Sequence, residues 1–347
     1  MRPARFAVIG CLLVAACGGT TGGEPATTVP VSLGELSYGY EPGSTYNYNV
    51  TLTQSLALDG SVAGDLPAED APIPDNADVT TTQEGTVMYE VAVGDEEGTI
   101  ELTITSSMET VDVSGTLDGE DLGEDIPPEM RMSEGELPPV TVVMDLQGNV
   151  VEASPGGAGL EGLANPLASL EGLIPGDPLR GPLGPTFPES EVGVGDEWSD
   201  EQTLDLLGEE VGYTTANQIT GVEDAVVVID STTTVSAFDI SLTEFLAELF
   251  GAAAASDAGA EEMLEQLEFT VSGDAADLET TNRFDPERGL ITASESDGTV
   301  AATIVVRLPD ESGTELVGFD ADASVTSSYQ VTLVEPGETP ASTTAGT

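Results

Sequence analysis

The sequence contains no histidine and no lysine, and it has only two cysteines in 347 residues. Without histidine, the chain cannot form a Ser-His-Asp or Cys-His catalytic set or a zinc site with imidazole ligands. Without lysine, it has no P-loop lysine, and it has no amine that could form a Schiff base or hold pyridoxal phosphate. Among the common catalytic classes, only carboxylate chemistry remains.

Positive charge is also scarce. Seven arginines stand against 64 aspartates and glutamates, so the formal net charge is −57. This balance excludes nucleic-acid binding by phosphate neutralisation and electrostatic attraction to an anionic membrane surface. Two interpretations of the acidity stay open. The acids form either a solvated coat that keeps an exported protein soluble in a salty medium, or a field that attracts cations or basic proteins.

Long apolar runs are absent except near the N-terminus. Phe6 to Ala16 form a mostly apolar stretch that follows Arg2 and Arg5. A membrane-spanning helix needs roughly 20 residues. The core of a signal peptide needs about 7 to 15, after a basic start and before small residues. The stretch is therefore typical of an export signal.

The end of this stretch adds a more specific motif. Val14-Ala15-Ala16-Cys17 places an aliphatic residue and two small residues before a cysteine, and it resembles the lipobox of bacterial lipoproteins. The resemblance implies that Cys17 receives a diacylglyceryl group, with acyl chains such as palmitate. It also implies that cleavage follows Ala16, that residues 1–16 are removed, and that the protein is anchored on the extracytoplasmic face of the cell membrane. The alternative is an ordinary secretory signal with an incidental cysteine.

The composition of the mature chain favours a folded, β-rich protein. Hydrophobic residues make up 39% of the chain, enough for a core, and aromatic residues only 5%, so aliphatic side chains should dominate that core. Alternating apolar and polar residues recur between turn sequences, which is typical of antiparallel strands. We expect the following organisation: a lipidated cysteine and flexible tether at 17–34, a β-rich half at 35–173, a Pro/Gly-rich linker at 174–190, a second β-rich half at 191–334 and a disordered tail at 335–347.

Turn sequences divide each half into hairpins. We expect turns at GDEEG (94–98), LQGN (146–149), GVEDA (221–225), DPERG (285–289) and SDG (296–298). Both halves open with an aromatic residue in an alternating segment, Tyr46 in the first and Trp198 in the second. We therefore predict a mainly β fold with antiparallel sheets in two related halves, the product of an internal duplication, with a few short helices.

One insertion is predicted to be helical, at residues 241–269. Ser241 and Glu244 fit a capping box, and Phe245, Leu246 and Leu249 then share one face. A shorter helix is predicted at 166–173. A curved sheet with helices across one face could enclose an apolar ligand.

The candidate ligand contacts are three residues of this insertion and one tryptophan. Phe245, Leu246 and Leu249, together with Trp198, would contact a hydrophobic ligand. The alternative is that the three insertion residues complete the core and that Trp198 anchors a strand entry.

Trp198 belongs to a further motif. Gly195-Asp196-Glu197-Trp198 follows Val194 near the start of an expected strand. This "VGDxW" pattern, together with Gly43 and Tyr46 in the first half, resembles an uncharacterised group of actinobacterial envelope lipoproteins. The resemblance implies a β-rich envelope lipoprotein and no particular activity.

Metal and cofactor motifs are weak. No stretch fits the EF-hand pattern, and the weak calcium candidates are Asp320 and Asp322 in "GFDADAS" or, alternatively, the acidic loop 118–125. The string GAGLEG at 157–162 matches G-x-G-x-x-G, but it lacks the preceding strand and following helix of a dinucleotide site. We expect no cofactor beyond the covalent lipid on Cys17.

The sequence therefore predicts a membrane-anchored, acidic envelope lipoprotein that acts as a non-enzymatic binding or structural module. Its expected partners are the membrane, through the lipid anchor, and either a hydrophobic small molecule or another envelope protein; nucleic acid is excluded. One alternative is a carrier of a lipid or other hydrophobic ligand in a cavity under the helices of 241–269. A second is a carboxylate-dependent hydrolase, which needs two acids facing each other in a cleft.

Overall fold

The computed structural model describes residues 32–63, 76–122, 135–136, 139–154, 184–206, 209–241, 268–309 and 316–335. All regular secondary structure in these residues is β-strand. The strands are β1 (Ser32–Gly34), β2 (Thr45–Ala63), β3 (Asn76–Val93), β4 (Thr99–Leu117), β5 (Glu120–Asp121), β6 (Gly135–Glu136), β7 (Val140–Asp145), β8 (Val150–Ser154), β9 (Val192–Gly193), β10 (Glu197–Leu206), β11 (Glu209–Glu223), β12 (Val226–Val235), β13 (Phe238–Ser241), β14 (Glu268–Gly273), β15 (Ala276–Asp285), β16 (Leu290–Pro309) and β17 (Leu316–Leu333).

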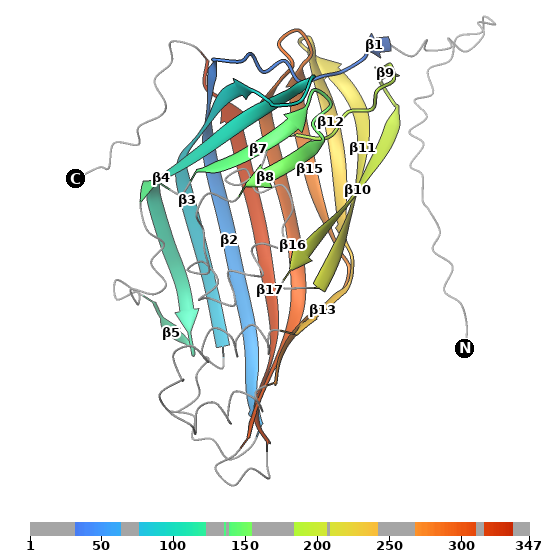
Figure 1. Cartoon of the computed structure of the whole chain (residues 1–347). Helices are drawn as coiled ribbons and strands as arrows, with labels where there is room; N and C mark the ends of the chain where they lie inside the picture. The colour runs from blue at the N-terminus through green and yellow to red at the C-terminus, as the bar shows by residue number, and fades with distance from the viewer. Residues whose placement is uncertain are drawn as a thin grey trace, which may run out of the picture.

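Nearly all of these strands belong to one antiparallel sheet. Its main path runs β10-β11-β12-β15-β16-β17-β2-β3-β4-β7-β8, with β13 and β14 extending it beside β16 and with β5 and β6 beside β4. The strands before residue 155 and those after residue 196 form two contiguous blocks, and the pairing of β17 with β2 joins the blocks. Figure 1 shows that the sheet curls, so that β7 and β8 lie in front of β15 and β16.

The hairpin turns explain the antiparallel order. The predicted turns at 94–98, 146–149, 221–225 and 285–289 all connect neighbouring strands. At 221–225, Asp224 and Ala225 have positive φ angles of 49° and 70°. Two consecutive left-handed residues make the type of turn whose twist matches that of a β-hairpin.

The predicted turn at 296–298 is wrong. Ser296 and Gly298 lie inside β16, which runs for 20 residues and is paired on both sides. The lack of a side chain at Gly298 lets Leu278 of β15 pack directly against the backbone of β16, because a Cβ at this position would overlap the Leu278 side chain. The glycine is therefore a site of close side-chain approach within a strand.

Alternation along the strands places the buried side chains on one face, which we call the inner face. It carries two apolar clusters. The upper cluster consists of Leu36, Tyr38, Tyr40, Tyr48, Val50, Leu52, Val87, Tyr89, Val91, Ile100, Leu102, Ile104, Val142, Met144, Phe187, Val192, Ile219, Val227, Ile229, Phe284, Leu290, Ile291, Tyr329, Val331 and Leu333. The lower cluster consists of Leu58, Ala77, Val79, Leu122, Val211, Tyr213, Val235, Phe238, Ile240, Phe269, Val271, Leu278, Val300, Ala302, Ile304, Phe319, Ala321, Ala323 and Val325.

Two segments outside the sheet hold the upper end together. The amide of Tyr38 donates to the oxygen of Leu146 in the β7–β8 turn, and the amide of Gly39 donates to the oxygen of Gly289 in the β15–β16 turn. The amide of Phe187 donates to the oxygen of Gln147. Residues 35–40 and 184–188 therefore tie the turns of the two blocks together.

Three boundaries predicted from the sequence are wrong. Residues 32–34, expected in the tether, form β1 and pair with β9. Pro185 and Phe187, expected in a linker, are buried. The ends of the predicted helical insertion are strands, since Ser241 ends β13 and Glu268 begins β14. They are strands because β13 pairs with β14, and β14 pairs on its other side with β16.

The described residues contain no helix, so the prediction of a few short helices is not confirmed. The predicted helical stretches 242–267 and 166–173 lie outside the described residues. Within the described ranges, no helix is long and apolar enough to cross a membrane.

Candidate ligand-binding face

A belt of buried, uncharged polar side chains crosses the inner face between the two apolar clusters. On β3, β11, β12, β15, β16 and β17, one or two polar residues lie between a neighbour from the lower cluster and a neighbour from the upper cluster, and on β4 Ser106 follows Ile104 of the upper cluster. On β11, for example, Asn217 lies between Tyr213 and Ile219. The belt consists of Gln83, Ser106, Asn217, Ser231, Asn282, Ser294, Ser296 and Ser327.

Strand register brings several belt residues side by side. Ser231 lies opposite Asn217 and donates its hydroxyl to Oδ1 of Asn217 at 2.7 Å. Ser294 donates in the same way to Oδ1 of Asn282 at 2.8 Å. Thr280 donates to the hydroxyl of Ser296 at 2.9 Å. These bonds satisfy much of the polar surface that the inner face buries.

Two buried polar atoms in the belt and the lower cluster have no hydrogen-bond partner in the described part of the chain. They are Nδ2 of Asn217 and the hydroxyl of Tyr213, four positions apart on β11 and therefore on the same face of the strand. Desolvation raises the pKa of Tyr213 to about 12. Both atoms are potential hydrogen-bond donors that a ligand on the inner face could satisfy.

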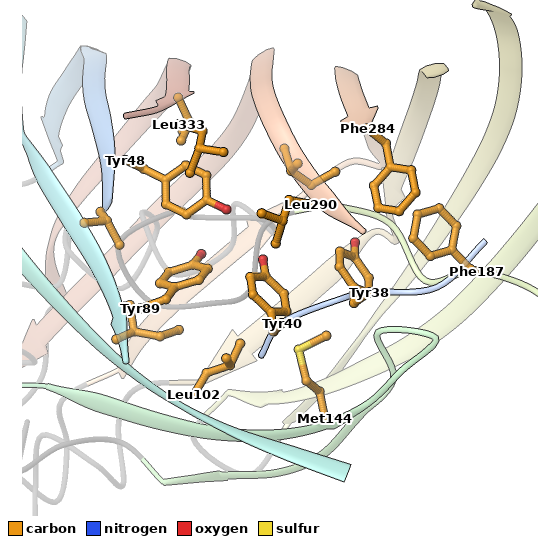
Figure 2. Close-up of a cluster of buried hydrophobic side chains, with 14 of the residues drawn as sticks. Tyr38, Tyr40, Tyr48, Tyr89, Leu102, Met144, Phe187, Phe284, Leu290 and Leu333 are labelled. Carbon is orange, nitrogen blue, oxygen red and sulfur yellow. The ribbon is translucent and has the colours of Figure 1, made fainter. Parts of the chain in front are cut away.

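Aromatic side chains fill the upper end. The ring of Tyr38 stacks on Tyr40 at 5.7 Å and contacts the rings of Phe187 and Phe284 at 5.1 Å and 5.9 Å. Its hydroxyl donates to the oxygen of Pro185 at 2.8 Å. Figure 2 shows Tyr38, Tyr40, Tyr48 and Tyr89 with their hydroxyls directed toward the middle of this packed cluster. The upper end of the inner face is therefore packed by protein side chains.

The hydroxyls of Tyr40 and Tyr48 are also buried. They interact electrostatically, but neither makes a hydrogen bond of standard geometry with a described residue. Desolvation by burial raises the pKa values of Tyr38, Tyr40 and Tyr48, and neighbouring phenols raise those of Tyr38 and Tyr48 further. For Tyr40, the interaction with Tyr48 lowers the pKa and Tyr46 raises it, but desolvation dominates. All three phenols are therefore neutral at physiological pH.

Charged side chains are confined to the outer face, the turns and the strand ends. Among the described residues, no aspartate, glutamate or arginine is buried. The three described arginines each pair with an acid: Arg283 with Glu223 at 2.6 Å, Arg288 with Glu335 at 2.8 Å and Arg307 with Asp320 at 2.5 Å. The inner face thus offers hydroxyl and amide groups and apolar surface, without charge, to anything bound there.

Of the predicted ligand contacts, the structure describes only Trp198. Trp198 is the second residue of β10 and packs against the upper cluster, with its ring 6.4 Å from that of Phe187. Its indole N–H donates to the oxygen of Thr186 at 2.5 Å. This position is that of an anchor at a strand entry. Phe245, Leu246 and Leu249 lie outside the described residues, as do Ala16 and Cys17.

The calcium candidates Asp320 and Asp322 lie on the outer face of β17. Asp320 forms an ion pair with Arg307, whose Nη1 also donates to the oxygens of Val306 and Phe319. Asp322 accepts a hydrogen bond from Thr303 at 3.0 Å. No group of three or more acidic or cysteine side chains within the described ranges is arranged to hold a metal ion.

The polar belt was missed at the level of sequence. Its signal is nevertheless present, because the apolar positions of each long alternating strand are interrupted near the middle. In β11 the inward positions read Val211, Tyr213, Thr215, Asn217 and Ile219. Only the register between strands shows that these interruptions line up across the sheet.

Comparisons with known proteins assign no family. No family model matches the chain, and no curated protein matches it. Among solved structures, a lipovitellin structure describing lipid–protein interactions is similar over 88% of this chain, with 12% identity and a TM-score of 0.35; the chain spans about a quarter (26%) of lipovitellin. An outer-membrane channel from Pseudomonas putida F1 is similar over 90% of this chain and 100% of the channel, with 8% identity and a TM-score of 0.22.

Proposed function

We propose that this chain is a lipid-anchored, non-enzymatic protein of the cell envelope that carries a lipid or another hydrophobic ligand against the lower cluster. The observation that carries the proposal is the contrast between the two ends of the inner face. The upper cluster includes side chains from segments outside the sheet, such as Tyr38 and Phe187. All members of the lower cluster except Leu122 come from strands. The lower cluster is thus an apolar surface of the sheet itself.

The dimensions of the strands suit an elongated apolar ligand. β16, β17 and β2 are 20, 18 and 19 residues long and pair side by side. At about 3.3 Å per residue, each strand spans about 60 Å. Apolar inner positions follow one another along the lower parts of β16 and β17, and β2 adds Leu58 beside them, a stripe along which an acyl chain could lie.

The predicted ligand contacts lie close in sequence to this surface. In sequence, segment 242–267 connects β13 to β14, and both strands contribute apolar residues to the lower cluster. Phe245, Leu246 and Leu249 belong to this segment, and we retain them as proposed ligand contacts. Trp198 packs in the upper cluster instead, so we assign it no ligand contact.

The proposed location follows from the N-terminal motif. Acylation of Cys17 would anchor the chain by a diacylglyceryl group, and two acyl chains hold a protein on a membrane stably where one does not. The residues after Cys17 would connect this anchor to β1. A carrier held in this way would exchange a hydrophobic ligand with the membrane or with another envelope protein.

Two adjacent alanines of β16 provide the test. Ala302 faces the lower cluster and is 7% exposed, whereas Ala301 is exposed on the outer face. Ala302 lies between Gly273 and Ala323 in the neighbouring strands, so a large side chain here would project into the space of the ligand. We expect Ala302→Trp to lose bound lipid and Ala301→Trp to retain it.

Native mass spectrometry of the full-length protein, purified from membranes in a mild detergent, measures the bound lipid directly. Circular dichroism reports whether each variant is folded. Retention of lipid by folded Ala302→Trp would contradict the proposed binding surface. If the wild-type protein carries no lipid and takes none up from added vesicles, the carrier function is wrong, and a structural module remains.

A further inference from the structure

The polar belt contains one buried hydrogen-bond donor that has no partner among the described residues. Asn217 is 2% exposed, and its Oδ1 accepts a hydrogen bond from Ser231, yet its Nδ2 has no partner in the described residues. Buried amide groups are almost always hydrogen-bonded, because losing water without replacement costs free energy. Asn282, equally buried and bonded to Ser294 in the same way, has no such unsatisfied atom among the described contacts.

A second unsatisfied donor faces the same side. The hydroxyl of Tyr213 is buried and has no described partner, and Tyr213 and Asn217 occupy inward positions of β11 about 13 Å apart along the strand. Tyr213 belongs to the lower cluster, and Asn217 marks the boundary of the belt above it. The two donors therefore lie where apolar surface gives way to polar surface.

The charges around this boundary restrict what could accept these hydrogen bonds. No described arginine lies on the inner face, and each pairs with an acid elsewhere, so an anionic group would be desolvated there without a counter-charge. No described carboxylate is buried, so a cationic group on the inner face would also lack a counter-charge. The overall charge of −57 also disfavours the approach of an anion. An uncharged oxygen acceptor fits both donors.

We propose that the ligand is an amphiphile with an uncharged, oxygen-bearing headgroup, a hydroxyl or an ester, and that Asn217 and Tyr213 donate hydrogen bonds to its oxygens while its acyl part lies against the lower cluster. This inference rests on the proposed carrier function and specifies the chemical class of the ligand. The belt determines the headgroup, and the lower cluster accommodates the chain.

Three probes separate headgroup recognition from apolar binding: dioleoylglycerol (uncharged, with ester and hydroxyl oxygens), oleate (anionic) and hexadecane (no headgroup). The full-length wild-type protein in detergent is offered the three probes together, and native mass spectrometry counts the bound species. We expect dioleoylglycerol to exceed each of the others by at least about tenfold, because each of the two proposed hydrogen bonds to a buried donor contributes about a factor of ten.

Asn217→Leu removes the proposed donor, and Asn282→Leu is its matched control. Each substitution removes a buried amide and deprives one serine hydroxyl of its acceptor. We expect Asn217→Leu to lower dioleoylglycerol occupancy about tenfold while hexadecane occupancy is kept, and Asn282→Leu to leave both unchanged. Urea unfolding shows whether the two variants are folded. If Asn217→Leu does not fold, Tyr213→Phe, which removes only one oxygen atom, replaces it as the test. We expect Tyr213→Phe also to lower dioleoylglycerol occupancy while hexadecane occupancy is kept.

The outcomes distinguish the inference from the function on which it rests. If none of the probes binds, the carrier function is wrong. If oleate or hexadecane binds as well as dioleoylglycerol, the carrier function stands and the headgroup inference is overturned. If dioleoylglycerol is preferred but Asn217→Leu and Asn282→Leu lower its occupancy equally, Asn217 has no special role and the headgroup inference is overturned.

Discussion

The hydroxyl of Tyr38 donates a hydrogen bond to the backbone oxygen of Pro185 at 2.8 Å, across 147 positions of sequence. The bond joins the segment before β2 to the segment before β9. Tyr48, by contrast, is buried in the same cluster with a hydroxyl that makes no hydrogen bond of standard geometry to a described residue. Of these two tyrosines in one cluster, only Tyr38 therefore contributes a hydrogen bond of standard geometry through its hydroxyl.

This difference predicts that replacing each tyrosine by phenylalanine changes the free energy of unfolding differently. Tyr38→Phe leaves the oxygen of Pro185 without its buried partner and should lower the free energy of unfolding by about 1–3 kcal/mol. Tyr48→Phe removes a desolvated hydroxyl and should leave the free energy of unfolding unchanged or slightly raised. Urea denaturation followed by circular dichroism measures both. Equal losses in the two variants would show that Tyr48 has a hydrogen-bond partner in solution.

The same tyrosines predict alkaline unfolding. Burial raises the folded-state pKa values of Tyr38, Tyr40 and Tyr48 above the ordinary value of 10.0. Below pH 10 both states hold the phenolic protons, so this stability is fully present. As the pH rises further, the unfolded chain releases protons that the folded chain retains. Stability should then fall by about 1.4 kcal/mol per pH unit for each such phenol.

Tyrosinate absorbance and circular dichroism, recorded together during an alkaline titration, test this expectation. The buried phenols should ionise only as the fold is lost. Tyr48→Phe should make the fall of the free energy of unfolding with pH shallower, because one phenol fewer contributes to it. Full ionisation of all seven tyrosines while the β spectrum persists would contradict the burial of these side chains.

The acidic composition predicts stabilisation by salt. A net charge of −57 destabilises the compact state by self-repulsion. Raising NaCl from 0.01 M to 1 M shortens the screening length from about 30 Å to about 3 Å. The free energy of unfolding should therefore rise, on the order of 1 kcal/mol or more. Urea midpoints at several salt concentrations measure the effect.

Calcium at matched ionic strength separates general screening from a specific site. If the acids act only as a solvated coat, CaCl₂ and NaCl should stabilise alike, apart from the weak preference of carboxylates for a divalent ion. If Asp320 and Asp322 bind calcium, CaCl₂ should stabilise more, and Asp322→Asn should abolish the difference. The ion pair of Asp320 with Arg307 favours the first result.

Cys17 provides a test of the membrane anchor. In cells given a labelled fatty acid, the wild-type chain should take up the label and fractionate with membranes. Cys17→Ser should lose both properties. Cys11→Ser is the matched control, because Cys11 would leave with the signal peptide and its replacement should change neither. A wild-type chain without label would remove the lipoprotein assignment.

Alternation and turn chemistry made much of the fold predictable. The strands beside the turns at 94–98, 146–149, 221–225 and 285–289 follow from local patterns, since period-two alternation and turn residues act over a few positions. The turn expected at 296–298 failed because local sequence cannot report that Gly298 lies opposite the large side chain of Leu278. Phe187 was expected in a linker because its flanking prolines and glycines outweighed its own hydrophobicity.

The sequence by itself determined the absence of histidine and lysine chemistry, the scarcity of thiols, the acidity and the antiparallel β class, because these depend on composition and short-range pattern. Only the tertiary structure decided that β17 pairs with β2 to join the two halves into one sheet. It also decided that polar positions scattered over seven strands form one belt, and that Asn217 and Tyr213 face inward without described partners. Long-range register sets these relationships, since a shift of one residue would turn each side chain to the opposite face.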